Sequence, residues 1–488
     1  NTIKQAIERK LSQEQMSLEY EFKLESARKE AEKVRIDAQG KADANRILNS
    51  SLTTNILRDK GIEATTKLSE SPNSKVIVIG GGIVGLSTAY YLSEEGHEVV
   101  VIDKGNLQGG ASNINAGYLT PSHIVPMAAP GMISKGVRWM FNASSPFYIK
   151  PRFDKDLIDW GLKFMKSCTP NHVQRSLKTI LDINLLSKQL YLEMQKSADF
   201  DFHLETKGLL MAYQSSHAEK EEAEIVSRAR ALGLEIKQLD SKEVLKLQPG
   251  TPMDISGAFW YESDAHSTPE IFMRNLKTTL EKKGVRFVLE TEVCGFEKQE
   301  NKITIVVTEK EFIKTDEVVV ATGAWSEKLL KSLGIKLSVQ AGKGYRMNVD
   351  YETGISLPAI LLESKVAVTP MRGFTRFAGT MEISGLNHKI MSKRVAAIAK
   401  AASTYYPDIK ITQEVIDDVQ CGLRPLSPDG LPFIGRHSAI SNLVLATGHS
   451  MMGWSLGPAT GKLVSELISG KTTTLSLKPF SPQRKYGN

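Results

Sequence analysis

The chain has 488 residues, of which 41% are hydrophobic and 24% charged, so it is long enough for two or three ordinary globular domains. Its net charge of +7 is spread along the chain without the dense basic run that grips nucleic-acid backbones. The three cysteines, Cys168, Cys294 and Cys421, lack the spacing of a metal site and cannot all pair, which favours a reducing compartment. We therefore expect a cytoplasmic protein that binds neither nucleic acid nor a metal ion.

Residues 1–72 form the first predicted segment, a charged helical one. Up to about residue 60 the segment contains no proline, and stretches such as KLESARKEAEKVR (Lys23 to Arg35) mix Glu, Lys, Arg and Ala with sparse apolar positions, as long exposed helices do. The runs AIERKLSQEQ, ARKEAEKVRIDAQGKADANRIL and LRDKGIEAT resemble the C-terminal helical region of prohibitin-like (band 7/SPFH) proteins. A solvated tail and a self-associating coiled coil both fit this pattern.

A turn-forming group, Ser71, Pro72 and Asn73, separates these helices from a buried strand, and we place the main domain boundary there. A strand (Lys75–Ile79), a helix (Ile83–Glu95) and a second strand (Glu98–Ile102) are expected next. The order strand, helix, strand predicts the beginning of a doubly wound parallel sheet.

A glycine motif lies between the first strand and its helix. Gly80 permits a tight turn, Gly82 lets the backbone approach a pyrophosphate, and Gly85 allows close packing of the helix on the strand. Asp103 follows Gly80 by 23 residues (103 minus 80) and ends the second strand, where a carboxylate can accept hydrogen bonds from ribose hydroxyls. The combination predicts a dinucleotide site, with a plain strand-end turn as the alternative for Asp103.

The later part of the chain alternates between helical and strand-rich stretches. Helices are expected over most of residues 154–246 with a strand near 208–213, short strands over 285–320 and 337–379, and a strand followed by a helix over 441–470. Two of these strands lead into glycine turns, in EVVVATGAW (Glu317 to Trp325) and at Thr447, Gly448 and His449. Two further turns of this kind suit a cofactor longer than NAD, which favours FAD.

From Lys75 onward the sequence is similar to the D-amino-acid dehydrogenase family, within the group of glycine oxidase, sarcosine oxidase and D-amino-acid oxidase. The motifs that carry this resemblance are VIVIGGGIVGLSTAYYL, VVVID, GGASNINAGYLTPSHIVPMAAPG, WMF, EVVVATGAWS, KGYRM, RFAGTMEISG, CGLRPLSPDGLPFIG and ATGHSMMGWSLGPATGKLVSELISG. The resemblance implies an α/β fold, in which a Rossmann-like FAD-binding domain carries an inserted α+β substrate domain. We assign 73–145, 260–332 and 418–488 to the first and 146–259 and 333–417 to the second.

The same resemblance implies the activity. A noncovalently bound FAD would oxidise a D-amino acid, with D-proline and hydroxy-D-proline as candidates, to the imino or 2-oxo acid in amino-acid catabolism. Electrons would pass to a quinone or another electron-transfer acceptor of the respiratory chain, which allows peripheral contact with the inner face of the cell membrane. A glycine or sarcosine type of amine oxidase that uses oxygen is one alternative, and a helical scaffold or assembly protein with a flavin domain is another.

Flavin oxidation of an amino acid requires the Cα hydrogen to face flavin N5 while the substrate carboxylate is held in place. The planar fork of an arginine can pair with both carboxylate oxygens. Arg424, in CGLRP, matches a family position that resembles the carboxylate anchor, with an internal ion pair as the alternative reading. Arg376, in the expected strand Thr375 to Thr380, is the second candidate, although strand alternation could point it to solvent.

Four other residues need weighing. Tyr345 in KGYRM could cover the substrate or donate a hydrogen bond, although packing is the commoner role of a strand aromatic. His449 and His123 could lie in cofactor loops, with a structural histidine as the alternative for each. Cys421 is expected to be an inert thiol and not a covalent flavin link.

Asp264 and His266 precede Pro269, which suits a helix start, and we interpret both as structural. The complete set of predicted cofactor-binding residues is Gly80, Gly82, Ile83, Val84, Gly85, Asp103, Lys104, Ser112, Asn115, Ala116, Gly117, Val293, Ala321, Thr322, Gly323, Gly448 and Gly453.

Overall fold

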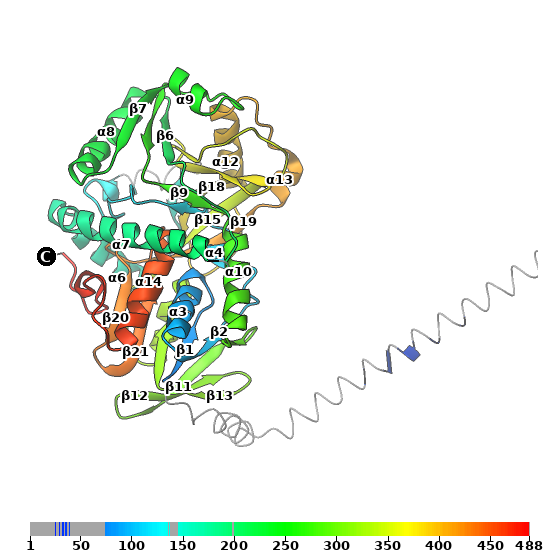
Figure 1. Ribbon diagram of the computed structural model, residues 1–488, viewed down its shortest axis with the longest axis vertical. Coiled ribbons are helices and arrows are strands. Elements are labelled where there is room, and N and C mark those ends of the chain that lie inside the picture. Colours follow the sequence, from blue (N-terminus) through cyan, green and yellow to red (C-terminus); the bar gives the residue numbers. More distant parts are fainter. Residues whose placement is uncertain are drawn as a thin grey trace, which may run out of the picture. The chain divides into compact units, whose positions relative to one another are not determined.

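The computed structural model describes residues 74–134, 136, 145–197 and 200–487, together with scattered positions between 25 and 39 (Figure 1). The chain divides into two units, Asn1–Leu68 and Ser69–Asn488. In the first unit the described residues are helical, and Lys29 pairs with Glu25 one turn away at 2.8 Å. The predicted boundary at 71–73, the WMF motif and most of the predicted helical segment lie outside the described residues.

A six-stranded sheet forms the base of the second unit. Its strands run in the order β10 (Arg286–Val288), β2 (Glu98–Ile102), β1 (Lys75–Ile79), β14 (Glu317–Val320), β21 (Ile440–Thr447) and β20 (Phe433–His437). All neighbours are parallel except β20, which runs antiparallel to β21. Every residue of β1 is buried, because both faces of the sheet are covered. The predicted Rossmann-like sheet is confirmed.

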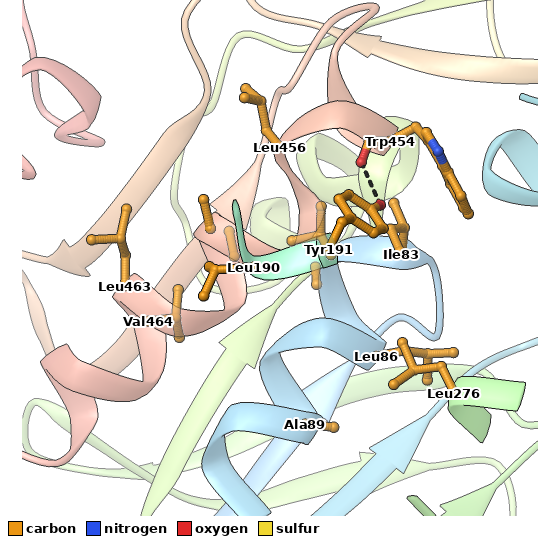
Figure 2. Close-up of a cluster of buried hydrophobic side chains, with 14 of the residues drawn as sticks. Ile83, Leu86, Ala89, Leu190, Tyr191, Leu276, Trp454, Leu456, Leu463 and Val464 are labelled. Atoms are coloured by element: carbon orange, nitrogen blue, oxygen red, sulfur yellow. Dashed lines mark hydrogen bonds between the residues drawn. The ribbon is translucent and has the colours of Figure 1, made fainter. Parts of the chain in front are cut away.

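Helices cover one face of this sheet. Helix α3 (Ile83–Glu94) lies beside α14 (Gly453–Ile468), with α7 (Pro170–Lys196) and α10 (Pro269–Lys282) packed against them (Figure 1). Figure 2 shows the apolar cluster at this junction, in which the Tyr191 hydroxyl donates to the Trp454 carbonyl at 2.8 Å. Helix α14 can approach α3 closely because Gly461 has no side chain. A Cβ at this position would lie 2.4 Å from the Ser87 carbonyl carbon.

A small antiparallel sheet covers the other face. It consists of β11 (Val293–Gln299), β12 (Lys302–Thr308) and β13 (Phe312–Lys314). Its apolar residues Ile303, Val306 and Ile313 pack into one cluster with alternate residues of β1 and β14. The sheet is therefore closed from water on both sides, which explains its continuous apolar strands.

A nine-stranded sheet forms the upper part of the second unit (Figure 1). The order is β19 (Gln420–Leu426), β15 (Gln340–Val349), β18 (Phe374–Ile383), β17 (Val366–Met371), β16 (Ala359–Leu361), β6 (Leu209–Tyr213), β8 (Gly257–Tyr261) and β7 (Ile236–Asp240), and β4 (Phe147–Ile149) pairs with β18. The predicted boundary at 418 places β19 in the FAD-binding domain, yet β19 pairs with β15 of this sheet. The remaining division into cofactor and substrate domains stays a prediction.

A third sheet, small and three-stranded, joins β3 (Tyr118–Leu119), β9 (Ala265–Ser267) and β5 (Leu204–Glu205). The other helices are α4 (Gly110–Asn113), α6 (Lys155–Ser167), α8 (Ser216–Ala231), α9 (Ser241–Leu247), α11 (Ser326–Lys331), α12 (Ser392–Tyr405), α13 (Gln413–Asp417), η1 (Gly323–Trp325) and η2 (Lys478–Phe480). Within the described part of the chain, no helix combines the length and apolarity needed to cross a membrane.

Candidate active site

A cavity of about 1060 Å³ is lined both by the loops that follow β1, β2, β14 and β21 and by strands of the nine-stranded sheet. The loops leave the carboxyl ends of parallel strands, which is where open α/β sheets bind ligands. The volume is at the upper end for a small-molecule site, so it can hold a dinucleotide together with a small substrate.

The turn between β1 and α3 has the geometry that its glycines predict. Gly80 adopts φ +106°, and a Cβ there would lie 2.5 Å from the Ala321 carbonyl oxygen. A Cβ on Gly85 would lie 1.8 Å from the Gly80 carbonyl oxygen, so Gly85 permits the close packing of helix on strand. At Gly82 the nearest atom to a Cβ is the Ser112 hydroxyl at 3.3 Å, which leaves room beside this backbone.

The amino end of α3 is suited to an anion. No acidic side chain occupies its first turn, and no side chain of the Gly82 cap closes it. The Ile83 N–H donates to the Ser112 hydroxyl at 2.9 Å, and this residue comes from α4. A helix amino end without an acidic residue favours a negatively charged group such as a diphosphate. These residues therefore fit the pyrophosphate of FAD.

Asp103 is fixed at the end of β2. One carboxylate oxygen accepts from the Gly81 N–H and the other from the Gly105 N–H, both at 2.7 Å. Each oxygen keeps a lone pair for a ligand hydroxyl. Beside it, the Lys104 ammonium lies 3.8 Å from the centre of the Trp325 ring, and burial lowers the pKa of Lys104. This end of the cavity therefore offers acceptors for ribose hydroxyls.

Arg424 brings a partly buried positive charge to the other part of the cavity. Its Nη1 donates to the Thr380 carbonyl at 2.9 Å, and among the described residues no carboxylate lies within ion-pair distance of it. Burial lowers the pKa of Arg424 to about 10, so the guanidinium is still protonated at neutral pH. A buried cation without a counter-charge is costly. The site therefore favours a carboxylate ligand.

A β-bulge positions this guanidinium. Lys343 pairs with Glu382 and Tyr345 pairs with Gly379, so two residues of β18, Thr380 and Met381, face the single Gly344 of β15. Thr380 has φ +72°, a strained conformation for a β-branched residue.

The strained turn places the Thr380 carbonyl against Arg424. Opposite it, Gly344 leaves the space that the guanidinium occupies, because a Cβ there would lie 2.0 Å from Nη1. Bulge and glycine together determine where the charge of Arg424 lies.

Three other candidate residues, Tyr345, His449 and His123, line the cavity as neutral groups. The Tyr345 hydroxyl donates to Glu382 Oε2 at 2.6 Å, and burial raises its pKa, followed by the effect of Glu382. His449 shares a hydrogen bond with the Thr460 hydroxyl at 2.9 Å, and burial lowers its pKa to about 3. Burial, and then Lys365, lower the pKa of His123 to about 4. Both histidines are therefore uncharged at neutral pH.

Arg376 corrects an expectation from the sequence. Its side chain is fully buried, it does not line the cavity, and it pairs with Glu270. Its remaining N–H groups donate to Asn348 Oδ1 and to the carbonyls of Asn113 and Asn115. With its fork occupied in this way, Arg376 points neither to solvent nor to a ligand.

Most of the predicted cofactor residues line the cavity, but Gly85, Gly117 and Gly448 do not. All three fit tight packing instead: a Cβ would lie 2.1 Å from the Ser267 carbonyl oxygen at Gly117 and 2.6 Å from the Phe433 ring at Gly448. Cys421 also lies outside the cavity lining, and burial raises the pKa of its thiol, which agrees with an inert role.

Sequence reasoning missed Gly344 and Thr380. Gly344 lies inside the KGYRM motif, and a glycine in the middle of a buried strand is a signal of close approach that could have found it. Thr380 carries no such signal, because nothing in the local sequence marks a threonine as left-handed.

Comparison with known proteins gives a consistent result. Residues 75–467 match the model of the family DAO, described as FAD dependent oxidoreductase. A D-amino acid dehydrogenase of Granulibacter bethesdensis is 30% identical over 420 residues, covering 85% of this chain and all of that protein. One from Vibrio atlanticus is 30% identical over 421 residues, covering 84% of this chain and 99% of its own length.

Solved structures share the fold at lower identity. Glycine oxidase from Geobacillus kaustophilus superposes with a TM-score of 0.67 at 22% identity, covering 85% of this chain and all of its own. L-proline dehydrogenase from P. horikoshii gives a TM-score of 0.64 at 21% identity, and the match covers 84% of this chain and 97% of that one.

Proposed function

This chain belongs to the DAO family of FAD-dependent oxidoreductases, and we propose that it oxidises a D-amino acid to the corresponding imino acid. The relatives that are 30% identical over nearly their whole length are D-amino acid dehydrogenases, which supports this substrate class. The observation that carries the proposal is Arg424, a partly buried guanidinium on the cavity wall without a carboxylate partner among the described residues.

Arg424 is proposed to hold the substrate carboxylate through both arms of its fork, oriented by the Thr380 carbonyl and by the space at Gly344. Its charge also disfavours protonation of a nearby substrate amine. The neutral amine can donate its lone pair as the Cα hydrogen leaves as hydride, so that a C=N bond forms. Water then converts an acyclic imino acid to the 2-oxo acid and ammonia, whereas the nitrogen of a cyclic substrate such as D-proline stays bonded to the carbon chain.

The remaining lining residues are proposed to hold the cofactor. The glycine turn at Gly80 and Gly82 and the amino end of α3 would bind the pyrophosphate, and Asp103 the ribose hydroxyls. When bound, FAD supplies the acceptor for the two electrons. The amino end of α14, at Gly453, also lines the cavity without an acidic residue in its first turn, which would stabilise negative charge there.

Anaerobic reduction of the purified protein tests this function. We expect the flavin absorbance to bleach with some member of a panel of D-amino acids that includes D-proline and hydroxy-D-proline, and to stay unchanged with the L-enantiomers. Bleaching only by L-amino acids would contradict the proposed substrate class. Lack of bleaching by any amino acid or amine would favour the scaffold alternative. Stoichiometric peroxide in air would favour an oxidase.

We further propose that a quinone or another electron-transfer acceptor reoxidises the cofactor at a membrane surface. In this proposal, helix α6 contacts the membrane. Its outward face exposes Ile158, Leu162 and Met165, one turn apart, and Phe153 precedes them fully exposed. Exposed basic residues, Lys150, Lys155 and Lys166, flank this row. An amphipathic helix with such a border suits the interface of an anionic membrane.

Sedimentation with vesicles of anionic phospholipid tests the contact. The double variant Ile158→Ser and Leu162→Ser should lose vesicle binding, whereas Leu185→Ser, an exposed leucine on α7, should keep it. Equal binding by both variants would contradict a role for α6. For residues 1–72 we propose self-association, which size-exclusion chromatography of a shortened chain would test.

A further inference from the structure

Three potential metal ligands meet on one face of the small three-stranded sheet. Glu205 of β5 lies directly opposite His266 of β9 in an antiparallel pair, so their side chains share a face. His203 precedes Glu205 by two positions, and side chains two apart along an extended segment point the same way. The three ligand atoms lie within 4.8 Å of one another.

The distances from each imidazole to the Glu205 carboxylate are close to those between two ligands of a tetrahedral centre. His203 Nε2 lies 3.5 Å from one oxygen of Glu205, and His266 Nε2 lies 3.5 Å from the other. Ligands bound to Zn²⁺ at about 2.0–2.1 Å in a tetrahedron are about 3.3 Å apart. A cation could therefore enter with only small side-chain adjustments.

His266 is the observation that calls for a ligand. Its side chain is fully buried, and neither ring nitrogen has a hydrogen-bond partner among the described residues. A buried imidazole without a partner destabilises the fold. A metal ion bound at Nε2 would give that nitrogen a partner.

His203 is also oriented so that one ring nitrogen faces Glu205. Its Nδ1 lies 2.8 Å from the Thr268 hydroxyl, and a proton donated there leaves the Nε2 lone pair directed at Glu205. Glu205 is about one-third exposed, which gives an ion a way in from solvent.

We propose that His203, Glu205 and His266 form a binding site for Zn²⁺ or a similar divalent transition metal, with water as the fourth ligand. Two imidazoles and one carboxylate are a donor set that such metals accept. The sequence predicts only a structural role for His266 and no metal, because its ligands come from segments about sixty residues apart. The site is separate from the flavin cavity, whose lining includes none of the three.

Lys207 provides the sharpest test. Its ammonium lies 2.8 Å from Glu205 Oε2, where it competes with a metal ion for the carboxylate. The side chain is half exposed and can move away. Lys207→Met should therefore tighten metal binding severalfold. If Glu205 served only to pair with Lys207, the same variant would leave metal binding absent and would lower stability.

The experiment uses the full-length flavoprotein, free of any affinity tag and stripped with a chelator. Isothermal titration with Zn²⁺ alone should show one site per chain, and Co²⁺ should give the intense visible absorption of a tetrahedral centre. Both signals should be lost in Glu205→Gln and in His203→Gln. The control is His217→Gln, because His217 and Glu221 form an exposed surface pair one turn apart that should not matter.

Flavin content and the melting temperature without metal show whether each variant is folded. Zn²⁺ should raise the melting temperature of the wild type and leave that of Glu205→Gln unchanged. Failure of the stripped wild type to bind Zn²⁺ or Co²⁺, or undiminished binding by folded Glu205→Gln and His203→Gln, would overturn the proposal. Neither result depends on turnover, so both are independent of the proposed catalytic function.

Discussion

Replacing Gly344 by alanine should slow reduction of the flavin about a hundredfold while leaving the cofactor bound. The new Cβ would lie 2.0 Å from Nη1 of Arg424 and 2.4 Å from both Cζ and Nη2, whereas ordinary contact begins at 3.4 Å. The guanidinium must therefore move by 1.0 Å (3.4 minus 2.4) to 1.4 Å (3.4 minus 2.0). A misplacement of about 1 Å can cost about 10²-fold in rate, or about 2.7 kcal/mol at about 1.36 kcal/mol per decade.

Stopped-flow reduction under anaerobic conditions measures this effect. An amine without a carboxylate should reduce the flavin of the variant and of the wild type at similar rates, because Arg424 does not hold it. Gly295→Ala is the matched control, since it also changes a strand glycine but its Cβ would meet no atom within 4 Å. Wild-type kinetics with D-amino acids in a fully flavinated Gly344→Ala protein would refute the assignment of the carboxylate anchor to Arg424.

Three further predictions concern other parts of the chain. Arg424→Ala should lose about 2–5 kcal/mol of transition-state stabilisation, measured as the second-order rate of flavin reduction, and Arg424→Lys should recover only part of it. Gly82→Val should still fold, because only the Ser112 hydroxyl lies near its Cβ. It should purify without FAD, because the new side chain occupies the space where the backbone approaches the pyrophosphate. Full FAD occupancy, measured by absorbance, would contradict this. Burial raises the pKa of Asp264 to about 7, so its neutral carboxyl stabilises the fold in acid and this contribution is lost as pH rises from about 4 through 7. Relative to wild type, Asp264→Asn should thus gain stability in urea unfolding between about pH 4 and pH 7, and a constant difference would argue against the shifted pKa.

The parallel sheet and its nucleotide turn were predictable because their signals are local. A continuous apolar strand, a turn that needs glycine and a carboxylate at the next strand end all follow from neighbouring residues. The two arginines could not be ranked in this way. Arg376 and Arg424 both lie in buried strands, and only the fold reveals that the partner of Arg376 is Glu270, 106 residues away. The bulge at Thr380 also breaks the alternation on which a sequence argument depends.

The same limit applies to the predicted boundary at residue 418. Strand β19 follows it in the chain, but its edge pairing with β15 comes from a segment about eighty residues earlier. Hydrogen-bond partners at such separation leave no mark in composition or periodicity.

The six-stranded sheet has a consequence for synthesis on the ribosome. Strand β1 is among the first parts of the second unit to emerge, yet β14, its neighbour, pairs on its other edge with β21 near the end of the chain. Until β21 and α14 are made, β14 has an open edge and α3 lacks its main packing partner. Nascent chains must therefore be shielded from aggregation until β21 and α14 have been made. Fragments that end before these elements would expose apolar surface for the cell's quality control to recognise.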